Sequence, residues 1–248
     1  MTSYCFYRNG SAEWNVFIPE TGPFLKDWTD SMVTTLRGVC SVFEDIFGKA
    51  QLSKYPNLSV CYSVDDPVTF SASDLIFLST TGQFPLQAVY QFAHELCHFI
   101  SHRRVCQTYC WLSETLCELM SWYALNWIAE HEKTCYLWSF HGLYELIPGH
   151  IEGAQKKRTD HGGLSTASII EKEIVHLQSD WYDRELNREI ALGLYPLFLA
   201  SPQLWQIVLY LPELPDEMPL CDAVDLLCSK AELSEAMTSK LRALLLEN

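Results

Sequence analysis

Two histidines and a glutamate at residues 94–98 have the types and the spacing of a catalytic metal site. The segment reads His-Glu-Leu-Cys-His inside an otherwise apolar run with helical spacing. On a helix, His94 and His98 lie one turn apart on one face, so both imidazoles can bind one metal ion. Glu95 points about 100° away from His94, where its carboxylate can take a proton from water instead of binding the metal. The motif therefore predicts zinc-dependent hydrolysis with Glu95 as the general base.

A catalytic zinc site also needs a third protein ligand and one open position. His102 continues the row of histidines, but it lies about 12 Å along the helix axis from His94, too far for both to bind one ion. We therefore expect that His102 does not bind the metal itself. It either hydrogen-bonds a residue that does, or has a structural role. The long metzincin motif requires Gly at 101 and His at 104, whereas the sequence has Ser101 and Arg104. The sequence therefore excludes the metzincin class of zinc peptidases.

The next predicted helix, residues 111–129, contains only two charged side chains, Glu114 and Glu118. Because this helix is apolar nearly all round, it should be buried, and buried carboxylates are costly unless they are paired or bind a metal. The two are one turn apart, so either could be the third ligand while the other hydrogen-bonds a ligand histidine. The alternative is that they form a solvated stripe on the helix.

Two segments resemble a known family. Residues 94–102, HELCHFISH, resemble the HELGHxxLH signature of the ImmA/IrrE-like metallopeptidases, and ETLCE at 114–118 resembles their ExxA[N/D] segment. The resemblance covers about residues 74–128 and implies that Glu114 is the third zinc ligand, with Glu118 in the place of the Asn or Asp. Cys97 departs from the usual Gly, and the gap from His98 to Glu114 is short for the family.

The resemblance also implies a function and a mode of substrate binding. The family is expected to act as intracellular regulatory proteases on a protein such as a repressor. The predicted strand at 75–79 could bind an extended peptide by edge pairing, as in the zincins that the chain resembles. The alternatives are a zincin-fold metal-binding module without proteolysis, and a helical interaction protein in which the motif is accidental.

The predicted fold class is α+β, with a zincin-like core of a small sheet and the two metal-bearing helices, followed by an all-helical C-terminal region. The predicted domains are a core at 1–147, a polar, Gly-rich loop or linker at 148–165, and a helical region at 166–248 packed on the core. Hydrophobic periodicity and turn residues place the individual elements. The predicted strands are 14–18, 58–63 and 74–80, and the predicted helices are 24–47, 85–102, 111–129, 166–177, 180–200, 202–211 and two after Pro219.

Composition narrows the setting. A net charge of −14 over 248 residues argues against direct binding of nucleic acid. The ten cysteines, with no visible signal peptide, indicate a reduced cytoplasmic protein. The uncharged stretch 190–211 is long enough to cross a bilayer, but Pro196 and Pro202 favour two buried helices instead. We therefore expect a protein or peptide substrate and no membrane partner.

Transition-state stabilisation would need a further Tyr, His or Arg. The sequence does not rank the candidates, which are Tyr109, Tyr123, His141, Tyr144 and His150.

Overall fold

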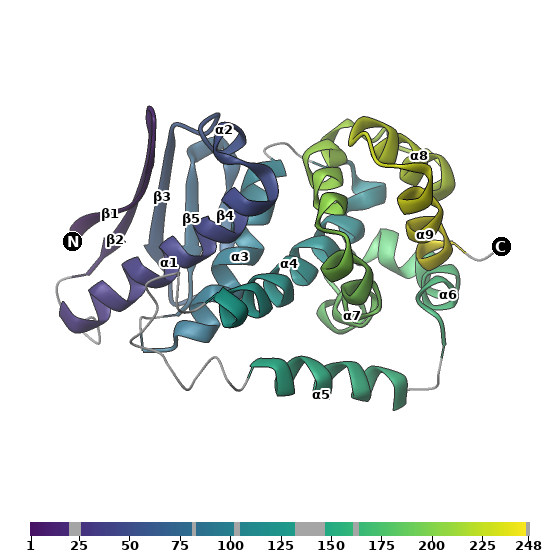
Figure 1. The fold of residues 1–248 in the computed structure, drawn as a ribbon, viewed down its shortest axis with the longest axis horizontal. Coiled ribbons are helices and arrows are strands. Elements are labelled where there is room, and N and C mark those ends of the chain that lie inside the picture. Colours follow the sequence, from purple (N-terminus) through teal and green to yellow (C-terminus); the bar gives the residue numbers. More distant parts are fainter. Residues whose placement is uncertain (20–25, 81–82, 102–104, 132–146, 161–163, 247–248) are drawn as a thin grey trace. The chain divides into compact units, whose positions relative to one another are not determined.

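The computed structural model describes residues 1–19, 26–80, 83–101, 105–131, 147–160 and 164–246 (Figure 1). The chain is α+β, as predicted: a five-stranded mixed sheet occupies the N-terminal part, and the C-terminal part is mostly helical. Internal contacts divide it into two compact units. The first comprises Met1–Ile100 and Met120–Pro148, and the second comprises Ser101–Leu119 and Gly149–Asn248.

The sheet has the strand order β1-β2-β3-β5-β4. The β2–β3 and β3–β5 pairs are parallel, whereas the β1–β2 and β4–β5 pairs are antiparallel. The prediction that the strand at 75–79 offers an open edge is wrong, because β5 lies between β3 and β4. The edge strand next to β5 is β4, which the sequence did not predict; the other edge strand is β1. The strands are β1 (Thr2–Asn9), β2 (Ala12–Ile18), β3 (Asn57–Tyr62), β4 (Val68–Phe70) and β5 (Leu75–Leu78).

The N-terminal hairpin was also missed by the sequence reading, although it carries a local signal. Asn9 pairs with Ala12 across a two-residue loop that begins at Gly10. Gly10 has φ 58°, a left-handed conformation that glycine adopts without a steric penalty. A two-residue loop with Gly in its first position, here Gly-Ser, is a recognised hairpin signal.

One face of the sheet forms the core of the first unit. Trp14 of β2 is fully buried, and its ring meets Phe99 of α3 edge-on at 6.2 Å. Its indole N–H donates to the carbonyl oxygen of Tyr55 at 2.9 Å. The hydroxyl of Tyr55 in turn donates to the carbonyl oxygen of Ile100 at 2.5 Å. These contacts hold α3, the helix with the histidine pair, against the sheet.

Most helices lie close to their predicted positions. The polar stretch expected to be a loop differs: residues 147–160 form helix α5. The segment predicted as a helix at 180–200 becomes helical only at Arg184, because Asp183 caps it by accepting from the backbone N–H of Leu186. The helices are α1 (Lys26–Phe47), α2 (Lys49–Leu52), α3 (Pro85–Ser101), α4 (Cys110–His131), α5 (Ile147–Asp160), α6 (Thr166–Ser179), α7 (Arg184–Ala200), α8 (Leu220–Lys230) and α9 (Glu235–Leu245), with 3₁₀ segments at Ser71–Ser73, Gln107–Tyr109 and Pro202–Glu213.

The uncharged stretch 190–211 is divided between α7 and the 3₁₀ segment that follows Ser201. Within the described parts of the chain, no helix combines the length and the apolar character needed to cross a bilayer. The nine cysteines of those parts are all thiols.

Candidate metal centre

Helix α3 brings the two motif histidines together. The Nε2 atoms of His94 and His98 lie 3.2 Å apart, and both side chains are half-buried. Two nitrogens bound to one tetrahedral zinc at 2.0–2.1 Å would be about 3.4 Å apart, from the bond lengths and the tetrahedral angle. The spacing of the two imidazoles therefore fits a shared ion with almost no movement.

Helix α4 is fixed to α3 by contacts near residue 121. The hydroxyl of Ser121 donates to the carbonyl oxygen of Tyr90 at 2.9 Å, and the Trp122 ring meets the Tyr90 ring edge-on at 5.8 Å. At 1.5 Å per residue, Glu114 lies about 10.5 Å from Ser121 toward the start of α4. His98 lies about 12 Å from Tyr90 toward the end of α3. The similar lengths are consistent with the closeness of the Glu114 and His98 ligand atoms.

The third member of the cluster is Glu114. His94, His98 and Glu114 each offer one ligand atom, and these atoms all lie within 4.8 Å of one another. A small rotation of a glutamate side chain closes a separation of this size. Two imidazoles and one carboxylate are also the donor set of known catalytic zinc sites. These residues form a possible metal-binding triad, the one His, Cys, Asp and Glu group of this kind among the described residues.

Both acidic residues of α4 are buried. Glu114 is 9 % exposed and Glu118 is 8 % exposed, so the alternative of a solvated stripe is wrong. Glu118 accepts a hydrogen bond at 3.0 Å from Nε of Arg188 on α7, and the pair is also an ion pair. The sequence offered no signal for this contact, since the residues are 70 positions apart. The expected hydrogen bond from Glu118 to a ligand histidine stays a prediction.

Glu95, the predicted general base, is 6 % exposed and is in contact with the edge strand. The hydroxyl of Thr69 in β4 lies 2.7 Å from Oε2 of Glu95 and 2.9 Å from its backbone carbonyl oxygen. Since a hydroxyl carries one proton, it donates to one of these oxygens at a time. The edge strand thereby restricts the orientation of the Glu95 carboxylate.

The other predicted site residues are less informative. His102, His141 and Tyr144 lie outside the described residues, as does the side chain of His150. Tyr109 is buried, and its hydroxyl donates to the carbonyl oxygen of Met218. Burial is the main cause that raises its pKa to about 12. Tyr123 is also buried, and its pKa is raised to about 12, again mainly by burial.

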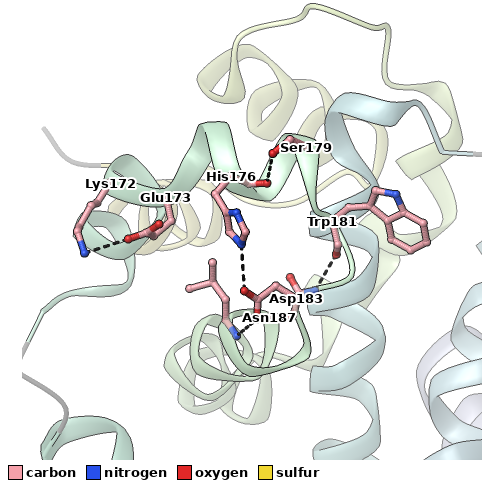
Figure 2. A network of polar contacts seen from close by, with 8 residues as sticks. Lys172, Glu173, His176, Ser179, Trp181, Asp183 and Asn187 are labelled. Carbon is pink, nitrogen blue, oxygen red and sulfur yellow. Dashed lines mark hydrogen bonds and ion pairs between the residues drawn. The ribbon is translucent and has the colours of Figure 1, made fainter.

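A second group of catalytic residue types lies at the α6–α7 turn, shown in Figure 2. His176 Nε2 and Asp183 Oδ2 are 3.0 Å apart, and Ser179 is close by in α6. The Ser179 hydroxyl, however, donates to the backbone carbonyl oxygen of His176 and not to its ring. The three residues therefore do not form a nucleophilic triad.

Comparison of the chain with protein-family models, with curated proteins and with solved structures found no match.

Proposed function

We propose that the chain is a zinc-dependent peptidase of the HExxH type, with His94, His98 and Glu114 as the metal ligands and Glu95 as the general base. The observation that carries the proposal is the meeting of the three ligand atoms from two helices. Glu95, the glutamate of the HExxH motif, directly follows His94 and is buried. The resemblance of residues 94–102 and 114–118 to the ImmA/IrrE-like metallopeptidases supports a zincin-like core and an intracellular protein substrate.

The chemistry follows from the residues of the chain. A bound zinc ion supplies a Lewis acid that makes water nucleophilic near neutral pH. Glu95 accepts the proton of the attacking water and returns it to the nitrogen of the leaving amine. Thr69 keeps the Glu95 carboxylate in one orientation during these transfers. Thr69 lies on β4, which is an edge strand of the sheet. An extended peptide would add to β4 by backbone pairing.

Metal content of the purified protein is the first test. We expect about one zinc per chain in the wild type and in Glu95→Gln, and a loss of zinc in His94→Ala. His131→Ala is the matched control, because His131 lies at the end of α4, stacked on Trp127 with ring centroids 4.0 Å apart. Zinc lost equally from His131→Ala and His94→Ala, or absent from the wild type, would contradict the proposal.

Proteolysis is tested separately with a mixture of quenched fluorescent peptides of random sequence. Wild-type protein loaded with zinc should cleave members of the mixture, and Glu95→Gln should cleave them at least about 100-fold more slowly, as for the loss of a general base. Equal cleavage by both proteins would refute Glu95 as the base.

A second candidate is a zincin-fold metal-binding module without proteolytic activity. It is favoured by one observation: the hydroxyl of Tyr109, one of the five unranked candidates for an oxyanion donor, donates to the carbonyl oxygen of Met218. Stoichiometric zinc in the wild type without cleavage of any peptide in the mixture is the result that this candidate predicts.

A further inference from the structure

Strand β4 has a contact to Glu95 on one face of the sheet and two apolar side chains on the other. Its middle residue, Thr69, lies opposite Ile76 of β5, which is fully buried. The Thr69 hydroxyl lies 2.7 Å from Oε2 of Glu95. Because successive side chains of a strand point to opposite faces, Val68 and Phe70 lie on the reverse face. Val68 is 38 % exposed and Phe70 is 50 % exposed, so both side chains reach the surface.

The apolar side chains of β4 continue into the neighbouring strand. Val68 lies opposite Phe77, and Phe70 lies opposite Leu75, in the antiparallel register. The Phe70 ring also meets the Phe77 ring edge-on, with ring centroids 6.0 Å apart. Leu75 and Phe77 are half-buried. These four side chains form one apolar surface, the β4–β5 patch (Val68, Phe70, Leu75 and Phe77), which ends at the edge of the sheet.

Strand β4 is short and uncharged. As far as the structure describes the chain, no strand pairs with its other side. Charged residues commonly protect an exposed edge, but the three residues of β4 are Val-Thr-Phe. An added peptide can form only a few backbone hydrogen bonds with so short a strand, and these bonds are nearly the same for every sequence. Any selectivity at this edge must therefore come from side chains.

A peptide that adds to β4 points its side chains alternately to the two faces of the sheet. The peptide residues opposite Val68 and Phe70 are two apart, and their side chains lie on the same face as the β4–β5 patch. The residue between them lies opposite Thr69, on the face where Thr69 contacts Glu95. Pairs of aromatic and β-branched residues across neighbouring strands stabilise a sheet. One face of the peptide is thus held by apolar contacts while the other faces the proposed general base.

We propose that Val68 and Phe70 are specificity-determining residues, which select extended peptide segments with large apolar side chains at two positions separated by one residue. The inference rests on the proposed peptidase function and names the substrate class of that site. Because the intervening peptide residue lies on the Glu95 face, the cleaved bond should lie at a constant distance in sequence from the apolar pair.

The first measurement maps the bonds that the zinc-loaded protein cleaves in a mixture of random peptides, by mass spectrometry of the products. Large apolar residues should be enriched at two positions, two residues apart. Each should favour cleavage by about 1.5–5-fold over Ser, from the contribution of one cross-strand pair. Cleavage without such a pair of positions would overturn the inference and leave the peptidase function standing. Absence of cleavage would overturn the peptidase function, and the inference with it.

A charge at position 68 should redirect the preference. In Val68→Lys, acidic residues should be favoured over basic residues by about 3-fold or more at one of the two positions, since opposite charges attract and like charges repel across a strand pair. The position opposite Phe70 should keep its apolar preference. Val175→Lys is the matched control, because Val175 is 77 % exposed and lies on α6. An unchanged pattern in Val68→Lys, or the same change in both variants, would overturn the assignment.

A binding measurement separates recognition from the chemical step. Zinc-loaded Glu95→Gln is titrated with a fluorescent peptide that has the preferred sequence, and with a second peptide that has Ser at both apolar positions. The second peptide should bind about 2–30-fold more weakly, from the loss of two cross-strand pairs. Adding Phe70→Ala should weaken binding of the first peptide and not of the second. An equal loss for both peptides would overturn the role of Phe70 in selection.

Discussion

The change from Glu114 to Gln should remove most of the stability that zinc adds to the protein. Glu114 is the one anionic residue of the triad, and its carboxylate lies within 4.8 Å of the ligand nitrogens of both histidines. Gln has nearly the same volume, so the packing around this buried position changes little. The effect should therefore appear in the metal-loaded protein.

The size of the effect follows from binding linkage. With free zinc at 100 times the wild-type Kd, the metal stabilises the folded wild type by about 2.7 kcal/mol. A 100-fold rise in Kd makes the zinc concentration equal to the Kd of Glu114→Gln, so the same zinc stabilises the variant by only about 0.4 kcal/mol. For a chain of this size, the difference of about 2.3 kcal/mol corresponds to roughly 5–9 °C in Tm.

The assay is thermal unfolding followed by far-UV circular dichroism, with zinc buffered at this concentration and with a chelator as the reference. The wild type should show the large zinc-dependent rise in Tm and Glu114→Gln almost none. Glu118→Gln should fall between them, because it loses a partner of Arg188 and not a ligand. The same zinc-dependent rise in the wild type and in Glu114→Gln would refute Glu114 as the third ligand.

Three further predictions concern single hydrogen bonds of the described residues. Thr115→Val should lower the free energy of unfolding by about 1–3 kcal/mol in urea, because it removes the donor to the buried Oδ1 of Asn187; an unchanged unfolding midpoint would contradict this. Thr69→Val should leave zinc content unchanged and slow peptide cleavage, with recovery in Thr69→Ser, because its hydroxyl orients the general base; equal cleavage by the Val and Ser variants would exclude that role. The pKa of His176 is raised, chiefly by its hydrogen bond with Asp183, and that of Asp183 is lowered, chiefly by the N–H of Leu186. The contribution of His176 to stability is therefore complete below its unfolded pKa near 6.5 and is lost as the pH rises through the raised value. His176→Gln should remove that part of the pH dependence, as measured by urea unfolding from pH 5.5 to 8.5, and an identical pH profile in both proteins would show that the pair contributes nothing.

The parts of the site that depend on helix period were predictable from the sequence. His94 and His98 had to share a face because they are four residues apart, and the structure brings their Nε2 atoms to 3.2 Å. The burial of Glu114 and Glu118 followed from the apolar residues around them. Both inferences use neighbours within one helix, where spacing in the sequence fixes spacing in the structure.

The order of the strands was not predictable in this way. The alternation of side chains places Ile76 and Leu78 on the buried face of β5, but it does not say which strand pairs with β5 on its other side. That strand is β4, a three-residue segment too short for a period to be detected. Because β4 is an edge strand and carries Thr69, the sequence alone predicted neither the strand to which a peptide would add nor the contact of Thr69 with Glu95.

The choice between Glu114 and Glu118 shows why a motif is incomplete without its distant contacts. The motif places two equivalent carboxylates one turn apart, and the resemblance of ETLCE to a known segment orders them only by analogy. The structure adds two facts to this analogy: the close group of ligand atoms contains Glu114, and Glu118 forms an ion pair with Arg188 of α7. Arg188 lies 70 residues after Glu118, in a region with no resemblance to the family. The burial of Glu118 is therefore compensated by a contact that the spacing of residues within one helix could not reveal.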